Sequence, residues 1–214
     1  MRNIIAIQHT QSEQHINKMI GSLGGWNLTK LGTKQAHSIG KNLADEYKNQ
    51  KFVIYSSDLP RAKQTAEIVS SYFNTTPIFT TALREFDLGE ANGKSKEWAT
   101  NNQQCPVWQG TIDWAKSVYD KPFIGAESKA DVRDRLSKFL NDVLAETDED
   151  IIIVSHDGTL SILYALWLVM DIEMLNKCNL SGKTGGVSVL QEDDDGNRII
   201  LRLNDMSYMK EGLK

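Results

Sequence analysis

Two histidines and one arginine stand next to short apolar runs of this sequence, and their side chains are the ones best suited to chemistry. His9 directly follows a run that ends in Ile7-Gln8, and His156 follows the β-branched run of residues 151–154. Arg61 comes shortly after a third apolar run. Imidazole and guanidinium groups that converge in one place form a site suited to a doubly charged anion such as phosphate, because their N–H groups match its oxygens.

The position of Arg61 supports an anion site. Pro60 favours the first turn of a helix, which places Arg61 in that same turn. A cation there is opposed by the helix dipole, which stabilises negative charge at the N-terminus. We therefore expect an anion to bind beside Arg61.

The elements that would position these side chains alternate between strand and helix. In such a fold, right-handed crossovers carry the carboxyl ends of parallel strands to one edge of the sheet, where ligands bind. The sequence predicts helices that begin at the cap Thr29 and at the cap Ser128. The other predicted elements are strands at 4–7, 52–55, 77–79 and 151–154, helices at 60–72 and 159–170, and a hairpin of 186–190 with 198–203.

Two long segments lack such periodicity. Residues 11–28 are polar and rich in glycine, so we predict a functional loop. The second segment holds Trp98, Trp108 and Trp114 among polar residues and prolines, and we predict a small helical lid there, at about 90–127. The tryptophans either pack the lid or line a pocket for a bulky leaving group, and the sequence leaves both open.

Composition limits the classes of function. The chain has 214 residues, 40% of them hydrophobic and 24% charged, which fits a single globular domain over 1–214. Its formal net charge is -4, so no broad basic surface for nucleic acid is expected. An anionic ligand would instead need a local basic pocket.

Cysteine usage and the N-terminus indicate a cytoplasmic protein. Cys105 and Cys178 lie far apart without a CxxC spacing, which argues against a disulfide framework or a thiolate metal site. The first apolar run is too short for a signal peptide or a membrane span. We therefore expect no membrane association.

Six segments, taken in order, resemble the histidine phosphatase superfamily, the phosphoglycerate mutase-like fold, over nearly the whole chain. The match is closest around Ser57-Asp58-Leu59-Pro60-Arg61-Ala62. The segments are residues 4–12, Leu28 to Ala36, Ile54 to Ala66, Leu83 to Phe86, Gly125 to Ser128 and Val154 to His156. The resemblance implies a three-layer α/β/α sandwich with a mostly parallel central sheet.

The resemblance also implies a mechanism. His9 would attack phosphorus and form a phosphohistidine that water hydrolyses, and Glu85 would be the general acid. Arg61 and His156 would hold the phosphoryl oxygens. The partner would be a small phosphorylated substrate or inorganic phosphate, with no metal and no other cofactor. For Glu85 a plain loop carboxylate, and for Arg61 and His156 a purely structural role, remain alternatives.

The sequence departs from the family pattern at four positions of this site. Gln8 stands where the family has arginine, so one positive charge is missing, and Thr10 replaces a glycine that lets backbone approach a ligand. His15 stands where an asparagine often contacts phosphate; a protonated His15 would supply the missing charge. Asp157 replaces a common glycine next to His156 and would raise the pKa of that imidazole, repel phosphate, or belong to the phosphate site.

These departures leave two main functional hypotheses. The first is a working phosphatase with reduced or altered activity, because loss of one donor from a preorganised anion site costs about 10²- to 10³-fold in turnover. The second is a phosphate-binding or regulatory homologue without catalysis. A phosphoglycerate mutase is a third, disfavoured because only about 40 residues separate Glu85 from Glu127. The sequence does not fix the oligomeric state, for which a homodimer is one option.

One further motif does not fit its usual function. Ser181-Gly182-Lys183-Thr184 resembles the end of a P-loop, which binds nucleotide phosphates. The first glycine of that motif would be five residues before Gly182, and Lys177 occupies that position. The sequence therefore gives no support for nucleotide binding.

Overall fold

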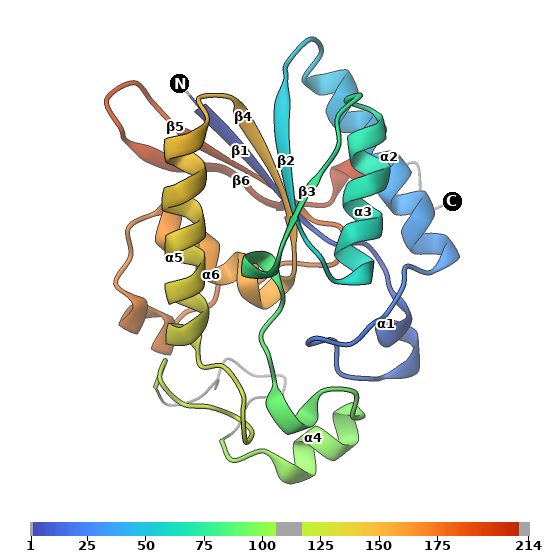
Figure 1. Ribbon diagram of the computed structural model, residues 1–214, viewed down its shortest axis with the longest axis vertical. Coiled ribbons are helices and arrows are strands. Elements are labelled where there is room, and N and C mark those ends of the chain that lie inside the picture. Colours follow the sequence, from blue (N-terminus) through green and yellow to red (C-terminus); the bar gives the residue numbers. More distant parts are fainter. Residues whose placement is uncertain (1, 106–116, 210–214) are drawn as a thin grey trace.

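The computed structural model describes residues 2–105 and 117–209, and these form a mixed six-stranded sheet between two helical layers (Figure 1). The strands lie in the order β3-β2-β4-β1-β5-β6. β1 to β4 are mutually parallel, whereas β5 is antiparallel to β1 and to β6. The predicted α/β/α sandwich with a mostly parallel sheet is therefore confirmed.

The strands fall close to the predicted apolar runs, and the C-terminal hairpin is present. β4 lies between β2 and β1, as expected for a run of four β-branched residues that is covered on both faces. The strands are β1 Arg2–Gln8, β2 Phe52–Ser57, β3 Ile78–Thr80, β4 Asp150–Ser155, β5 Val187–Glu192 and β6 Arg198–Asp205.

The helices begin where capping chemistry places them. The hydroxyl of Thr29 accepts the N–H of Gly32, and that of Ser128 accepts the N–H of Asp131, so both predicted caps are confirmed. The helices are α1 Glu13–Asn17, α2 Lys30–Glu46, α3 Pro60–Ser71, α4 Lys96–Asn102, α5 Lys129–Glu146 and α6 Asp157–Trp167. Short 3-10 turns lie at η1 Thr81–Leu83, η2 Gly89–Ala91 and η3 Ile172–Asn176.

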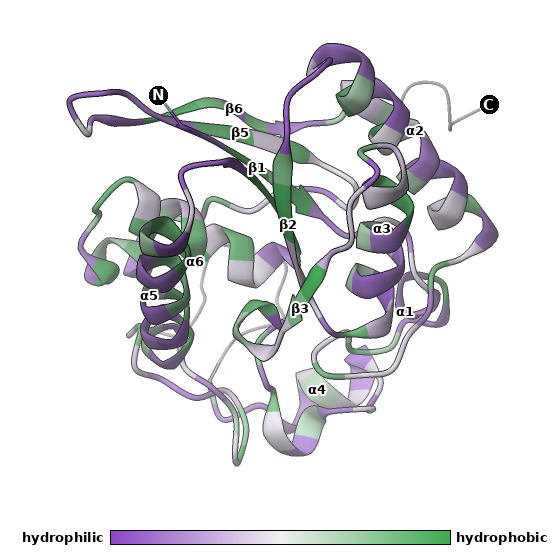
Figure 2. Cartoon of the chain, turned by 45° about the horizontal axis from the view of Figure 1, so that its top comes forward, coloured by the Kyte–Doolittle hydropathy of each residue, from purple (hydrophilic) through white to green (hydrophobic). Residues whose placement is uncertain are grey.

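The central residues of β1 and β4 are apolar at every position because successive residues enter different cores. Ile4 and Ala6 of β1 pack toward α5 and α6, whereas Ile5 and Ile7 pack toward α2 and α3. β4 divides its residues in the same way. Figure 2 shows the apolar strands at the centre and hydrophilic outer faces on the helices.

Two predicted elements differ from the structure. The segment 11–28 is not a pure loop, because Glu13–Asn17 form the short helix α1, with Ser12 and His15 making a capping box. α6 begins at Asp157, two residues earlier than predicted, so that His156 is its N-cap residue. Both differences lie next to predicted site residues.

The register of the sheet places the two strand-end histidines side by side. Gln8 of β1 pairs with Ser155 of β4, so the following residues, His9 and His156, leave adjacent strands at the same level. The backbone N–H of His9 donates to the carbonyl of Ser155 at 2.9 Å. β2 ends on the other side of β4, at Ser57.

The described parts of the predicted lid lie beyond this edge of the sheet. α4 stands at the lower end of the molecule in Figure 1. Trp98 on α4 stacks on the buried Phe123 with ring centroids 6.0 Å apart, which favours a packing role. Trp108 and Trp114 lie outside the described residues, so the extent of the lid stays a prediction.

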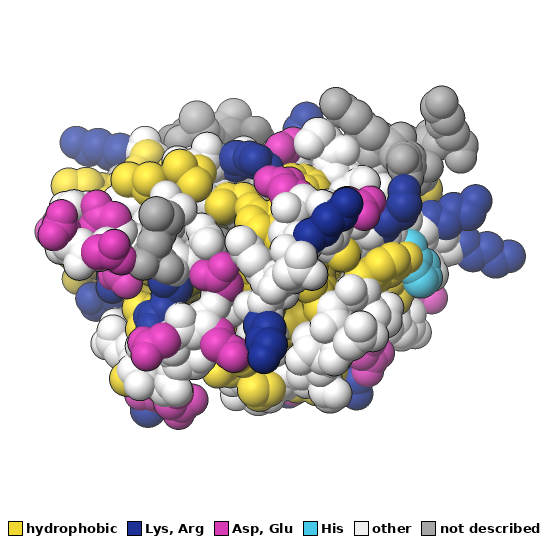
Figure 3. Space-filling model, turned by 90° about the horizontal axis from the view of Figure 1, so that it is seen from above, with side chains coloured by type: hydrophobic (Ala, Val, Ile, Leu, Met, Phe, Trp, Pro, Cys, Tyr) yellow, Lys and Arg dark blue, Asp and Glu magenta, His cyan; other side chains and the backbone are white. Residues whose placement is uncertain are grey.

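On the face opposite α4, acidic, basic and apolar side chains are interspersed (Figure 3). In the described part of the chain, no helix is long and apolar enough to cross a membrane.

Candidate active site

The edge of the sheet where β1 and β4 end opens into a cavity of about 580 Å³. Most of the site residues predicted from the sequence line it. These are Gln8, His9, His15, Arg61, Glu85 and Asp157. His156 is fully buried beside it, with its ring centroid 5.1 Å from that of His9. The predicted convergence of two imidazoles and a guanidinium is therefore confirmed.

His9 presents an unprotonated nitrogen. Its Nδ1 lies 2.8 Å from the carbonyl oxygen of Thr10, which can only accept, so Nδ1 carries the ring proton and Nε2 is unprotonated. Burial, followed by the charge of Arg61, holds the pKa of His9 well below its usual value. The ring is thus neutral at neutral pH, as a nucleophile must be.

Arg61 is fully buried at the start of α3, and the protein fixes its guanidinium on three sides. Its Nε donates to Nε2 of His9 at 3.1 Å, and its terminal nitrogens donate to the carbonyls of Ser22 at 2.8 Å and Gly24 at 3.1 Å. Burial lowers the pKa of Arg61 to about 10, which leaves it charged at neutral pH. Three of its five N–H donors are used in these bonds.

His156 is held from one side only. Its Nε2 lies 2.9 Å from the hydroxyl of Ser57, whereas its buried Nδ1 has no hydrogen-bond partner among the described residues. Burial and the charge of Arg61 hold the pKa of His156 well below its usual value. All the principal causes lower this pKa, and Asp157, one of whose possible effects was to raise it, is not among them. A buried nitrogen without a partner is uncommon, and a ligand oxygen would satisfy it.

Glu85 lies against the N-terminus of α6. Its carboxylate accepts the backbone N–H groups of Phe86 at 3.0 Å and Thr159 at 3.2 Å. Burial raises its pKa and outweighs the hydrogen bonds from the backbone of Phe86 and Gly158 and the charge of Arg61, which lower it. A carboxyl group that holds its proton at higher pH suits general acid catalysis.

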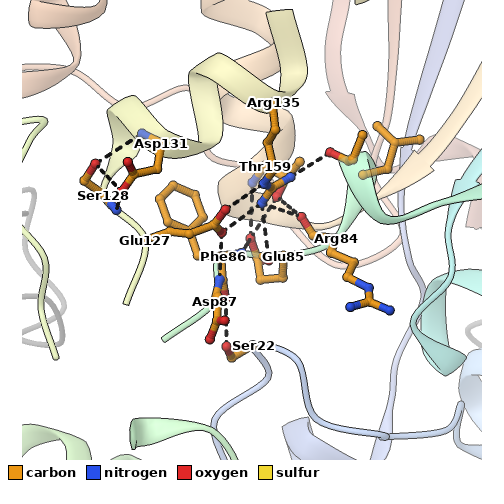
Figure 4. A network of polar contacts seen from close by, with 12 residues as sticks. Ser22, Arg84, Glu85, Phe86, Asp87, Glu127, Ser128, Asp131, Arg135 and Thr159 are labelled. Atoms are coloured by element: carbon orange, nitrogen blue, oxygen red, sulfur yellow. Dashed lines mark hydrogen bonds and ion pairs between the residues drawn. The ribbon is translucent and has the colours of Figure 1, made fainter. Parts of the chain in front are cut away.

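A second arginine fixes the segment that carries Glu85. Arg135 reaches from α5 to the backbone of this segment, as Figure 4 shows. Its guanidinium donates to the carbonyls of Ala82 at 2.6 Å and Arg84 at 2.9 Å, and it pairs with Glu127 at 2.9 Å. Thr159 donates its hydroxyl to the same Arg84 carbonyl at 2.7 Å. The backbone on which Glu85 stands is therefore tied to both α5 and α6.

Thr10 does not obstruct the cavity, although it stands where the family pattern has a glycine. Thr10 is fully buried, and its hydroxyl donates to the carbonyl of Gly32 at 2.8 Å. The same hydroxyl lies 3.4 Å from the hydroxyl of Thr65. The side chain therefore fills the seam between α2 and α3. Gln8 lines the cavity, and 8% of its surface is exposed.

His15 offers a neutral donor, which differs from the protonated group expected from the sequence. The backbone N–H of Ser12 donates to its Nδ1 at 3.0 Å, so the ring proton lies on Nε2. Partial burial of the ring and the charge of Lys96 lower its pKa. The Nε2 of His15 lies 3.3 Å from the hydroxyl of Thr184. The ring of His15 stacks on that of His9, with the ring centroids 5.7 Å apart.

Asp157 directs both carboxylate oxygens at a neighbouring loop. One accepts the backbone N–H of Gly182 at 2.6 Å, and the other accepts the hydroxyl of Ser181. A direct contact between Asp157 and phosphate stays a prediction.

Several groups of this site were not predicted from the sequence. Ser57 ends a strand just as His9 and Ser155-His156 do, so the same reasoning would have found it. The carbonyls of Ser22 and Gly24 left no signal, because a backbone acceptor does not depend on residue type. Lys96, Lys183 and Thr184 line the cavity from segments remote in sequence, which pattern analysis does not bring together.

The described residues include no group of three or more His, Cys, Asp or Glu side chains arranged to hold a metal ion. Comparison with known proteins assigns the chain to one family. The family model for the histidine phosphatase superfamily (branch 1) matches residues 4–205. The chain therefore belongs to the histidine phosphatase superfamily.

Named relatives cover most of the chain at modest identity. Phosphoserine phosphatase 1 of Hydrogenobacter thermophilus is 26% identical over 212 residues, which are 99% of this chain and 96% of the relative. A 2,3-bisphosphoglycerate-dependent phosphoglycerate mutase of Rhizobium meliloti is 27% identical over 83% of this chain and 85% of its own. The structure of a mycobacterial glucosyl-3-phosphoglycerate phosphatase solved with VO3 superposes with a TM-score of 0.82 at 21% identity. The superposition covers 95% of this chain and 99% of that chain. That structure shares the fold.

Proposed function

We propose that this protein is a phosphomonoesterase that hydrolyses a small phosphorylated metabolite through a phosphohistidine at His9. The observation that carries the proposal is the unprotonated Nε2 of His9, held 3.1 Å from the guanidinium of Arg61 in a shared cavity. Relatives named as phosphatases support the same reaction class.

In the first step, Nε2 of His9 bonds to phosphorus while the bond from phosphorus to the ester oxygen breaks. The substrate's phosphoryl oxygens take over N–H donors of Arg61, which releases the lone pair of Nε2 for attack. Nδ1 keeps its hydrogen bond to the Thr10 carbonyl, which stabilises the positive charge that develops on the ring. If Ser57 donates to Nε2 of His156, then Nδ1 of His156 carries a proton toward a phosphoryl oxygen.

Glu85 serves both steps. It gives its proton to the leaving ester oxygen, which departs as an alcohol, and becomes a carboxylate that the N-terminus of α6 stabilises. In the second step, this carboxylate takes a proton from water as the water oxygen attacks phosphorus. The bond from phosphorus to Nε2 of His9 breaks, and inorganic phosphate and the starting enzyme result.

The site carries less positive charge than the family pattern, which supports a slow or selective enzyme. Gln8 and His15 contribute neutral N–H donors where the pattern has an arginine and an asparagine. Loss of one charged donor is consistent with a turnover reduced by about 10²- to 10³-fold. The alternative, a phosphate-binding or regulatory homologue without catalysis, is favoured only by this loss of charge at Gln8.

The test is release of inorganic phosphate from a panel of phosphomonoesters by the wild type, with His9→Ala as control. We expect wild-type hydrolysis well above that of His9→Ala. Wild-type rates equal to those of His9→Ala, together with measurable phosphate binding, would instead support the non-catalytic alternative. Transfer of the phosphoryl group within 3-phosphoglycerate, without its release, would indicate the mutase.

We also propose a cytoplasmic location and leave a homodimer as one state to test. Fractionation of cells and light scattering of the purified chain test these two points independently of activity. Protein in a membrane or extracellular fraction, or a monomer mass in solution, would overturn the respective point.

A further inference from the structure

The glycine-rich loop of residues 181–186 lies beside His9, and its first four residues are the ones that resemble the end of a P-loop. Gly185 adopts a φ of +80°, and its N–H donates to the carbonyls of Gln8 and His9, at 3.2 Å each. Thr184 contacts His15, and both Lys183 and Thr184 line the cavity. The segment that resembles the end of a P-loop therefore lines the cavity of the candidate active site.

This loop is anchored along its whole length. Asp157 binds Ser181 and Gly182 at its start, as described above, and Asn204 accepts the N–H of Lys183 at 2.6 Å in its middle. A Cβ atom on Gly186 would lie 1.8 Å from the same Asn204 oxygen, so a larger residue there would displace the Asn204 side chain. The backbone of Lys183 is therefore fixed, while its side chain is exposed at the mouth of the cavity.

The carboxylates that line the cavity are already engaged by protein donors. Glu85 accepts from α6, Glu127 pairs with Arg135, Asp120 accepts the N–H of Ser117 at 3.0 Å, and Asp157 binds the loop. In contrast, the ion pairs found among residues 2–105 and 117–209 do not include Lys183. Among the described residues, its ammonium group therefore has no carboxylate partner, and it can bind a ligand.

We propose that Lys183 determines specificity by binding a carboxylate on the leaving group of the substrate, and that Asp157 is the positioning residue that holds Lys183 at the cavity mouth. The proposal rests on the proposed phosphatase function. In an in-line displacement the leaving oxygen lies opposite the attacking nitrogen, so the leaving group extends away from His9. The mouth of the cavity, where Lys183 stands, is the place such a group would reach.

The test compares two substrates that differ only in the carboxylate, 3-phosphoglycerate and glycerol 3-phosphate. Wild type should favour 3-phosphoglycerate in kcat/KM, and Lys183→Met should reduce this preference about 10-fold, mostly through KM, because a charge-assisted hydrogen bond is lost. Asp157→Gly should reduce the preference similarly, and the double variant should lose no more than either single variant. Asp157→Asn keeps one acceptor oxygen, so it should retain more of the preference for 3-phosphoglycerate than Asp157→Gly does.

Matched controls separate this role from a general loss of structure. Lys177→Met removes an exposed lysine that does not line the cavity and should leave the preference unchanged. Lys96→Met removes another cavity lysine, next to His15, and should weaken both substrates equally. Hydrogen exchange at Gly182 and Lys183 should quicken in Asp157→Gly and not in Lys183→Met.

An unchanged preference in Lys183→Met, additive losses in the double variant, or loss of the preference in Lys96→Met alone would overturn the proposal. So would a wild type without the preference. If the wild type hydrolyses no phosphomonoester of the panel, these two compounds and p-nitrophenyl phosphate included, the proposed function fails. Calorimetric affinities for the same two compounds then still decide the role of Lys183.

Discussion

The Nε of Arg61 lies 3.1 Å from Nε2 of His9, so the guanidinium donates directly to the nitrogen that would attack phosphorus. This contact has two consequences in the free protein. The hydrogen bond holds the imidazole of His9 in one orientation, and the positive charge of Arg61 helps to keep that ring unprotonated. A phosphate group that enters must compete for the same N–H, which couples binding to release of the nucleophile.

Replacement of Arg61 by lysine tests this coupling. The ammonium group cannot reproduce the planar fork that holds His9 and two carbonyls, so we expect kcat/KM to fall about 10²- to 10³-fold. Arg84→Lys is the control, since Arg84 pairs with Asp58 outside the cavity and is partly exposed. Thermal unfolding of both variants shows whether the fold persists. A similar loss in both variants would contradict a specific role for Arg61.

Glu85→Gln should reveal a general acid through its dependence on the leaving group. We expect a loss of about 10²- to 10⁴-fold on alkyl phosphates and little change on p-nitrophenyl phosphate, whose leaving group needs no proton. The exposed Glu90→Gln on the same segment should behave as wild type. Equal losses on both classes of substrate would rule out proton donation by Glu85.

The pH profile of the wild type follows from the same residues. The pKa of His9 is lowered, so the nucleophile stays unprotonated into the acid range. The pKa of Glu85 is raised, so kcat/KM on alkyl phosphates should fall as rising pH ionises this acid. The optimum should therefore lie on the acid side of neutrality, and the alkaline decline should vanish with p-nitrophenyl phosphate.

Gln8→Arg tests whether the missing charge limits turnover. We expect a gain of at least 10-fold in kcat/KM, because a charged donor would join the phosphoryl site. If His15 partly compensates for Gln8, then His15→Ala should cost less in the Gln8→Arg background than in the wild type. No gain from Gln8→Arg, in a variant that unfolds at the wild-type temperature, would show that charge at position 8 is not limiting.

Gly32→Ala tests how α2 supports the segment that carries the nucleophile. A Cβ atom on Gly32 would lie 1.9 Å from the backbone oxygen of Gln11, two residues after His9. We expect the free energy of unfolding to fall by about 1–3 kcal/mol, as for other overpacked sites. Gly25→Ala is the control, since a Cβ there meets no atom within 4 Å. Equal denaturation midpoints for the two variants would contradict the close contact.

The fold could be predicted from the sequence because its signals are local. The runs of residues 4–7 and 151–154 are apolar at every position, which identifies strands covered on both faces. Thr29 caps α2, and Ser128 caps α5. The convergence of His9, Arg61 and His156 followed from topology alone, since parallel strands end at one edge of the sheet.

The rest of the site depends on contacts that sequence patterns do not encode. The neutral tautomer of His15 follows from the capping box of α1, a helix too short to give a periodic signal. The hydrogen bonds of Asp157 are made to a loop that begins 24 residues later in the chain. Partners brought together only by tertiary packing were therefore missed, although Asp157 itself was singled out.

The most direct test of the central assignment is detection of a phosphoenzyme by rapid acid-free quenching and mass spectrometry after mixing with p-nitrophenyl phosphate. Wild type should gain one phosphoryl group on a peptide that contains His9, labile to acid and stable to base, and His9→Ala should gain none. Hydrolysis that persists at the wild-type rate in His9→Ala, or a phosphoryl group found on another residue, would contradict it.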